Sequence, residues 1–537
     1  MLIVVGAVVG GLTYKWRVMI TIIFGVSMIV LDSTVVNVAF QTLRREFDVG
    51  IDEAQWIISV YVLALGIATP LAGCLADRFK LKRVYVAGLC IFLLGSLMSG
   101  LAPSFWLLVG ARALQGLGGG IALPLSTVML FTTFDNEEQG RAFGIYGVVM
   151  VAAPAIGPIV GGLLADTNLW RWIFFINIPI GLIGIGLAIR ILRATEPKRS
   201  INFNPISLIT IIAGFGCVLY AASIVNHYGW ISVPVLSFFA VAVVALAVFA
   251  VYDLKYARDP LLELRLFKDH TFLKANLVGY VAVIALFGAE FLMPVYLQSL
   301  RGRTAMQTGL ILLPIAATTG VINLIVGGIY DKIGPRLLVV AGAAILLVNT
   351  WQFAGLSSST PISQILVLLV LRGLAISLVM QPTYTIALGL LPKESVSRGS
   401  SLVNSSRFVV QALGVAVLAT ILGSTLSPEV KQVQRDLQNQ ESGFGLCEQQ
   451  QTNPQLKQAC EENLAGFERA YSFTFYAALI ALVLGALLPG YPNAWAGRGA
   501  IKIRLWPARL GPRFSPRSGR QHKAWGASPR IESQKCD

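Results

Sequence analysis

The feature that most constrains this chain is a series of apolar runs, each about 20 residues long and almost free of charge. Such runs occur at 18–40, 57–75 and 84–101, and they recur along most of the sequence. A helix of this length crosses a hydrocarbon core about 30 Å thick. Because lipid cannot hydrogen-bond the backbone, only helices and closed barrels span it, and the runs lack strand-like alternation. The sequence therefore predicts an all-α polytopic membrane protein.

The runs predict fourteen transmembrane helices, arranged as two six-helix halves at 1–200 and 257–490 with an inserted pair, helices 7 and 8, at 201–256. The second half includes a long external loop, 424–470. A basic tail, 491–537, is rich in Pro, Gly and Ser, so we expect it to be disordered. The predicted spans are 18–40, 54–75, 84–102, 105–128, 142–164, 171–191, 205–225, 231–252, 273–298, 306–329, 336–356, 362–389, 401–423 and 471–490.

The distribution of Lys and Arg predicts the orientation. With the N-terminus inside, the inside segments before the tail hold 20 of these residues and the short outside loops hold five. An excess of Lys and Arg marks cytoplasmic loops. We therefore expect a multi-pass protein of the cell (inner or plasma) membrane with both termini in the cytoplasm. The formal charge of +15 follows from this topology and does not indicate nucleic-acid binding.

Cys447 and Cys460 lie in the predicted external loop with twelve residues between them. An oxidising compartment would allow a disulfide, and free thiols are an equally open alternative. No spacing of Cys and His is typical of a metal site, so no metal or cofactor is expected. The nucleotide-binding pattern GxxxxGK[ST] does not occur, which argues against ATP hydrolysis by this chain.

A short pattern occurs twice, about 250 residues apart. Gly73-x-x-x-Asp77 and Gly327-x-x-x-Asp331 each lie at a predicted cytoplasmic turn between two helices. Arg112 and Arg372 match in the same way about one helix further along. The two halves are therefore parallel repeats, and such repeats place a substrate site between them near the membrane midplane.

Five segments carry a family resemblance when taken together. They are GCLADRFKLKR (73–83), RALQGLGGG (112–120), AIGPIVGG (155–162), LDSTVVNVAF (31–40) and WRWIFFINIPIG (170–181). These segments resemble the loop 2–3, fourth-helix, fifth-helix, first-helix and sixth-helix motifs of the major facilitator superfamily, in its fourteen-spanner drug:proton antiporter branch. The similarity covers roughly residues 18–490. It implies the major facilitator fold.

Two positions depart from the pattern of that branch. Lys80 and Leu81 stand where the family usually has Gly and a basic residue, so the tight turn must be made differently. Phe40 and Gln41 replace the usual Leu-Pro, which changes how the first helix ends.

Four ionisable residues are predicted inside spans: Asp32, Arg112, Glu290 and Arg372. Each costs about 3 kcal/mol on insertion scales, so a functional role is favoured. Asp32 and Arg112 belong to the first- and fourth-helix motifs, and the resemblance implies proton coupling for both. A buried structural pair is the alternative.

Glu290 belongs to no recognised motif, and we assign it to substrate binding together with Asn37, Gln115, Phe291 and Tyr296. The neighbours of Glu290 are apolar and flexible, which suits a pocket for hydrophobic cations. The alternative is a glutamate that is paired with Arg372 or with the backbone.

The resemblance also implies residues of a conformational switch. Asp77 would latch the two halves through basic residues and helix ends, with Gly73 and Arg78 beside it, and Asp331 would act likewise in the second half. The fifth-helix motif adds small and helix-bending residues that permit close packing. These are Gly157, Pro158, Gly161 and Gly162.

The predicted function is proton-coupled export of amphiphilic, mainly cationic drugs or toxic compounds by alternating access. A dedicated exporter of one metabolite or antibiotic and a non-transporting membrane sensor are the alternatives. The expected partners are small amphiphilic molecules, protons and the lipid bilayer, with a periplasmic adaptor as an open further partner. Neither nucleic acid nor an enzymatic reaction is expected.

Overall fold

The computed structural model describes residues 12–135, 138–167, 169–193, 204–257, 260–389, 391–392, 395–427, 430, 447 and 454–489. These residues are helical or irregular, and no strand occurs among them. The helices are α2 (Tyr14–Val38), α3 (Phe40–Glu46), α4 (Ile51–Ala54), α5 (Trp56–Phe79), α6 (Leu81–Gly100), α7 (Phe105–Thr133), α8 (Gln139–Asp166), α9 (Trp172–Phe175), α10 (Asn177–Ile191), α11 (Pro205–Tyr228), α12 (Val233–Lys255), η1 (Leu264–Lys268), α13 (His270–Val295), η2 (Tyr296–Leu300), α14 (Ala305–Ile333), α15 (Pro335–Ala354), α16 (Ile362–Gly389), α17 (Val396–Ser424) and α19 (Pro454–Ala486).

Most of these helices are long and apolar enough to cross a membrane. Twelve spans meet both criteria among the described residues. Two further helices, α8 with 28 residues and α13 with 26, coincide with the predicted spans 142–164 and 273–298. The structure therefore indicates a multi-pass membrane protein, while the number fourteen stays a prediction. One predicted span, 171–191, consists of two pieces, α9 and α10, separated at Ile176.

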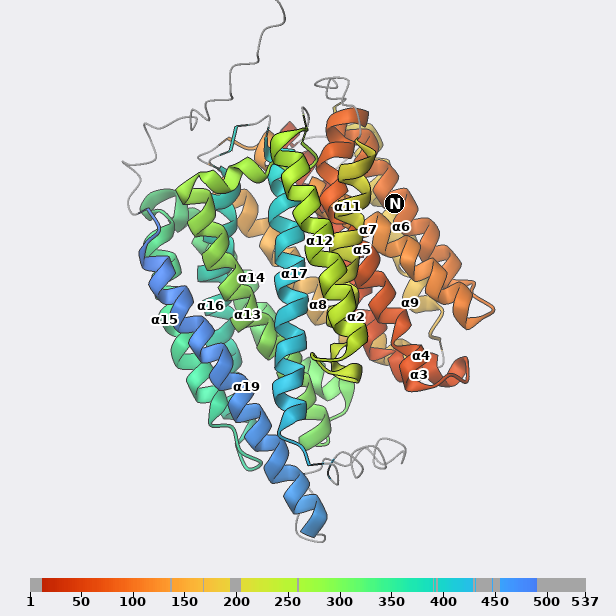
Figure 1. The fold of residues 1–537 in the computed structure, drawn as a ribbon, viewed down its shortest axis with the longest axis vertical. Helices are drawn as coiled ribbons and strands as arrows, with labels where there is room; N and C mark the ends of the chain where they lie inside the picture. Colours follow the sequence, from red (N-terminus) through yellow and green to blue (C-terminus); the bar gives the residue numbers. More distant parts are fainter. Residues whose placement is uncertain are drawn as a thin grey trace, which may run out of the picture.

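The inserted pair lies between the two halves. In Figure 1, α11 and α12 stand in front, with the red and orange helices of the first half on one side and the green to blue helices of the second half on the other. Helix α11 contacts α5 of the first half and α17 of the second, so it spans the junction. Only 17% of the apolar window of α12 is buried, which suits a helix that faces lipid.

The first helix ends earlier than predicted. It stops at Val38, and Ala39 turns the chain into the short helix α3, which begins at Phe40. At the other end of the bundle, Lys15 at the start of α2 donates to Glu138 in the connection between α7 and α8 at 2.6 Å. The end of α19 reaches the same end of the bundle, because Gly485 packs against Val339 near the start of α15. We call this end, which carries the turns at 78–83 and 332–336, the basic end.

The two repeated turns share an uncommon backbone conformation. Lys80, between α5 and α6, has φ +76°, and Gly334, between α14 and α15, also has φ +76°. The two residues are equivalent in the repeat, since each lies three positions after the aspartate of the pattern. Positive φ suits glycine and strains a residue with a side chain. The turn at Lys80 is therefore made with a strained lysine instead of the glycine of the family pattern.

Cys447 and Cys460 form a disulfide at the opposite end of the bundle. The backbone N–H of Cys447 donates to the carbonyl of Leu300 at 3.0 Å, which ties Cys447 to the end of η2. Both sulfurs lie in a buried apolar cluster with Tyr296 and Phe467. The disulfide thus anchors Cys447 to the second half.

Replacing Lys80 by glycine should stabilise the protein by about 1 kcal/mol, because it removes the strain of positive φ at a turn that is otherwise unchanged. Thermal unfolding of the purified protein in detergent measures the effect. Gly334→Ala is the matched control and should lower the unfolding temperature. A Lys80→Gly variant that unfolds at or below the wild-type temperature would contradict the argument.

Candidate functional site

The first part of the candidate site is a buried polar cluster around Asp32. Arg112 on α7 donates from Nη1 to Asp32 Oδ2 at 2.5 Å, and their side chains are 1% and 0% exposed. The other carboxylate oxygen, Oδ1, accepts from Asn177 Nδ2 at 2.8 Å and from Gln115 Nε2 at 3.1 Å. Both oxygens are therefore satisfied by protein donors. The cluster joins α2, α7 and α10.

Arg112 makes three further contacts besides its bond to Asp32. Its Nη1 also donates to Gln115 Oε1 at 2.9 Å, and its Nε donates to the carbonyl of Ile57 on α5 at 3.2 Å. Its guanidinium carbon lies 4.2 Å from the centroid of the Tyr61 ring. A guanidinium is always charged and has five donors, so it holds a carboxylate firmly as long as that carboxylate is ionised. Protonation of Asp32 would remove this attraction and leave Arg112 without its counter-ion.

Sequence reasoning missed Asn177 and Ser96 as members of this cluster. Asn177 bonds both Asp32 and Ser96, whose hydroxyl donates to the carbonyl of Phe174 at 2.9 Å. The signal was present, since Asn177 is the single amide within the apolar segment WRWIFFINIPIG. Gln115, expected at a substrate surface, is instead fully buried in the cluster.

The second part of the site is a latch between the halves at the basic end. Asp77, near the end of α5, accepts from Ser397 Oγ at 2.8 Å and from Arg398 Nε at 3.0 Å. Ser397 and Arg398 lie in the first turn of α17, where the partial positive charge of a helix start favours an anion. The side chains of Asp77 and Arg398 are 9% and 14% exposed, so solvent screens the pair weakly.

The glycines of the repeat bring helices of opposite halves into backbone contact. A Cβ at Gly73 would lie 2.6 Å from the carbonyl oxygen of Ser397, and the N–H of Gly73 donates to Ser401 Oγ at 2.9 Å. In the second half, Gly327 on α14 lies directly against Gly140 on α8, with 2.8 Å from such a Cβ to the carbonyl carbon. The pairs α5–α17 and α8–α14 therefore close the basic end in the same way.

Asp331, the counterpart of Asp77, lies near the end of α14, and its side chain is outside the described residues. Arg78 follows Asp77 in α5, and its guanidinium carbon lies 5.5 Å from the centroid of the Phe79 ring. The hydrogen bonds of the latch aspartate are therefore described for Asp77, in the first repeat.

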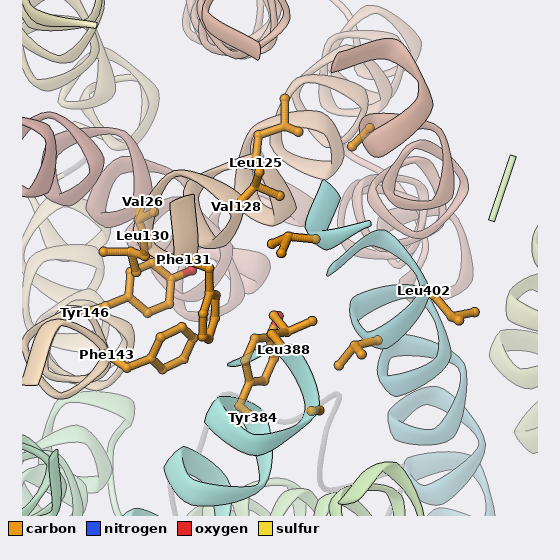
Figure 2. Packing of buried hydrophobic residues seen from close by; sticks show 14 of the residues in the cluster. Val26, Leu125, Val128, Leu130, Phe131, Phe143, Tyr146, Tyr384, Leu388 and Leu402 are labelled. Carbon is orange, nitrogen blue, oxygen red and sulfur yellow. The ribbon is translucent and has the colours of Figure 1, made fainter. Parts of the chain in front are cut away.

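A cluster of aromatic side chains, which we call the aromatic plug, lies in the buried core (Figure 2). We define it as Phe131 on α7, Phe143 and Tyr146 on α8, and Tyr384 on α16. The ring centroids of Phe143 and Tyr384 are 5.1 Å apart, and Phe143 lies 5.2 Å from Phe131 and 5.4 Å from Tyr146. Because Phe143 and Tyr384 belong to different halves, the plug seals the seam between them.

A second acidic residue lies close to the latch. Glu263 precedes η1 and interacts electrostatically with Arg398, the residue that bonds Asp77. Burial raises the pKa of Glu263, and the charges of Arg398 and Arg265 oppose that rise. Arg398 therefore interacts with Asp77, Glu263 and Asp253, and Glu263 gains a proton more readily than a free glutamate.

Small residues of the fifth-helix motif pack α8 against α2. Gly157 lies against Thr34, and a Cβ at Gly161 would be 2.8 Å from the carbonyl oxygen of Val35. The motif therefore sets the distance between α8 and the helix that carries Asp32. Pro158 and Gly162 lie within α8, and their side chains are outside the described residues.

The residues predicted to bind substrate do not converge in this conformation. Asn37 is exposed near the end of α2 and is not in the Asp32 cluster. Tyr296 is fully buried, and its hydroxyl donates to the carbonyl of Ser357 at 2.7 Å, so it belongs to the packing at the opposite end. Glu290 and Phe291 lie in α13 with side chains outside the described residues.

The second half contains its own buried arginine. Arg372 on α16 donates to Asn349 Oδ1 at 3.2 Å and to the carbonyls of Ala285 and Leu286 on α13 at 2.6 and 3.1 Å. It therefore ties α13 to α15 and α16 as Arg112 ties helices of the first half. A further arginine, Arg407 on α17, lies inside the predicted span 401–423, and sequence reasoning overlooked it.

Comparison with known proteins identifies the family. A profile of the Major Facilitator Superfamily matches residues 22–415. The chain belongs to the Major Facilitator Superfamily. This protein is thus a membrane transporter of that superfamily and not an enzyme, as the motifs indicated.

Relatives of this major facilitator protein include resistance proteins. The methylenomycin A resistance protein of Streptomyces coelicolor is 34% identical over 412 residues, which cover 75% of this chain and 84% of the relative. The multidrug resistance protein Stp of Mycobacterium tuberculosis is 31% identical over 404 residues, 75% of each chain. The structure of the proton:xylose symporter XylE has a TM-score of 0.57 at 13% identity and covers 89% of this chain and 96% of its own, which supports the fold.

Asp77→Asn should open the latch, because the amide keeps a hydrogen bond with Ser397 and loses the charge that holds Arg398 and the start of α17. Ser405 is buried on the same face of α17 as Ser397 and Ser401, so it reports on opening. In a Ser405→Cys protein, with the four cysteines outside the disulfide replaced by serine, labelling by an impermeant maleimide should accelerate about tenfold. The exposed residue Asp48 gives the control Asp48→Asn, and equal labelling in both variants would refute the latch.

Proposed function

We propose that this protein is a proton-coupled antiporter that exports amphiphilic, mainly cationic compounds by alternating access. The observation that carries the proposal is the buried Asp32–Arg112 pair, a carboxylate with no solvent contact inside a transporter of this superfamily. An ionisable residue at that depth is retained at a cost and marks proton or ion pathways in membrane proteins.

Proton coupling would work through the change of charge on Asp32. Ionised, Asp32 holds Arg112, Gln115 and Asn177, and through them α7 and α10. A proton on the carboxyl group would weaken the contact with Arg112 and loosen these helices relative to α2. This links proton binding to helix movement without any cofactor.

The closed basic end defines one state of the cycle. The latch, the glycine contacts and the aromatic plug seal the seam where α5 and α8 meet α17 and α14. The excess of Lys and Arg favours the cytoplasm for this end. The structure would then correspond to a state that is closed toward the cytoplasm, and release of the latch would give the state that accepts compounds from inside.

The class of substrate is supported by the relatives. Two relatives are a multidrug resistance protein and a methylenomycin A resistance protein. Selection of cations is assigned to Glu290, the acid in α13 that belongs to no coupling motif. An exporter of amphiphilic toxic compounds agrees with these two relatives and with the role assigned to Glu290.

The simplest test of the proposal is whether transport depends on a proton gradient. One proton moving down about 100 mV and one pH unit supplies roughly 3.7 kcal/mol, about a 500-fold gradient. Inverted vesicles that contain the protein should accumulate ethidium when a proton gradient is imposed and should lose it when a protonophore is added. Accumulation that ignores the protonophore, or none with any amphiphilic dye, would overturn the proposal.

The two acids should have separable roles. Asp32→Asn should abolish proton-driven uptake of every substrate, charged or neutral, because the site no longer takes up and releases a proton. Asp32→Glu keeps the titratable group and serves as the control. Since Asn leaves Arg112 unpaired in the interior, dye binding by the purified variant must show that it is folded.

Glu290→Gln should instead weaken transport of cations about 5- to 150-fold, most for divalent ones, and leave neutral compounds unaffected. Proton-driven uptake of one cationic and one uncharged substrate by the same vesicles measures the difference. Equal loss of both substrates would make Glu290 a coupling residue or a structural one.

A further inference from the structure

Arg407 stands at the seam between the halves, on top of the aromatic plug. It lies on α17, and its guanidinium carbon is 4.5 Å from the centroid of the Tyr384 ring. Tyr384 in turn stacks on Phe143 of the first half. On its other side Nη2 faces Gly279 on α13, where a Cβ would be only 2.6 Å from that nitrogen. Position 279 therefore needs a glycine, because a side chain there would overlap the guanidinium of Arg407.

Two of the three guanidinium nitrogens of Arg407, Nε and Nη2, are buried and have no hydrogen-bond partner among the residues that the structure describes. None of the ion pairs between described side chains includes Arg407. The residue as a whole is half-buried, so part of its side chain is reached by solvent while these two nitrogens are not.

The other two embedded arginines each have several hydrogen-bond acceptors at the guanidinium. Arg112 bonds a carboxylate, an amide and a backbone carbonyl. Arg372 bonds an amide and two backbone carbonyls. Arg407 has an aromatic face on one side and a glycine on the other, and in the described part of the chain no acceptor lies at Nε or Nη2.

The neighbouring tyrosines that the structure describes do not compensate the charge of Arg407. The Tyr280 hydroxyl is used to donate to Ser406 Oγ at 2.7 Å, and the contact with Tyr384 is through its ring. A cation–π contact is worth less than a charged hydrogen bond. Because a guanidinium stays protonated in proteins and leaving it unpaired in the interior is costly, the position suits an anion that comes and goes.

We propose that Arg407 binds an acidic group, a carboxylate or sulfonate, carried by the exported compound. The two free donors form the planar fork that such groups match, and the Tyr384 ring supplies an apolar surface for the rest of the molecule. The inference rests on the proposed export function and deepens it. With Glu290 assigned to the cationic group, Arg407 extends the range of substrates to zwitterions and organic acids.

The test compares two dyes that differ only by a methyl ester. Rhodamine 110 has a free carboxylic acid, and rhodamine 123 is its methyl ester. Binding of each to the purified protein in nanodiscs is measured by fluorescence anisotropy, without a proton gradient. The variants are Arg407→Gln, Arg407→Lys and, as a matched control, Arg190→Gln, which changes an exposed arginine at the end of α10.

Arg407→Gln should weaken binding of rhodamine 110 about 10- to 100-fold and change binding of rhodamine 123 less than about twofold. Arg407→Lys should lose less, because it keeps the charge without the fork, and Arg190→Gln should behave as wild type. Equal loss of both dyes, or no loss, overturns the proposal. If Arg407→Gln does not fold, Gly279→Ala, which displaces the guanidinium, must produce the same selective loss.

Two competitors identify the source of the anion. Benzoate should displace rhodamine 110 from the wild type, and chloride should not. Displacement by chloride at equal concentration would assign an inorganic anion site and overturn the substrate role. If neither dye binds the wild type, the proposed multidrug function fails separately. Anion binding at Arg407 is then tested with benzoate, which should raise the unfolding temperature of the wild type but not of Arg407→Gln.

Discussion

A charge inside the hydrocarbon core must be satisfied by the protein itself, and this constraint organises the transporter. Arg112 draws α5 and α7 around Asp32 of α2, and Arg372 draws α15 and α16 around the carbonyls of α13. Each half is therefore built around one buried guanidinium. In the first half this guanidinium is paired with a buried carboxylate, and that pair makes Asp32 the candidate for proton coupling.

The seam between the halves combines polar contacts with the aromatic plug. The latch of Asp77 with Ser397 and Arg398 and the contact of Thr127 with Ser400 join the halves through hydrogen bonds that can be broken and remade. The backbone contacts at Gly73 and Gly327 permit a close fit without large buried side chains. These polar and glycine contacts separate with less loss of apolar burial than the aromatic plug beside them.

The sequence was sufficient for those features that depend on local composition. The apolar runs located the helices, and the repeated pattern located the two turns that the structure places at one end. The partners of Asp77 could not be predicted, because Ser397 and Arg398 lie about 320 residues away and are brought near by the docking of α17.

Other features depend on tertiary packing and were missed for that reason. Gln115 appeared to face a substrate path, yet packing turned it into the Asp32 cluster beside Asn177. Arg407 lies in a segment rich in serine that resembles an ordinary polar helix face, and only the packed helices show that its Nε and Nη2 have no acceptor among the described residues.

The central claim is that protonation and opening of the basic end are linked. Spin labels at Phe79 and Leu337, exposed residues near that end in opposite halves, report their separation by double electron–electron resonance. The four cysteines outside the disulfide are first replaced by serine. The account predicts that a population with a longer distance grows as the pH is lowered, since a protonated Asp32 no longer holds Arg112, and that Asp32→Asn shows this population at every pH. A distance distribution that depends on neither pH nor Asp32 would contradict it.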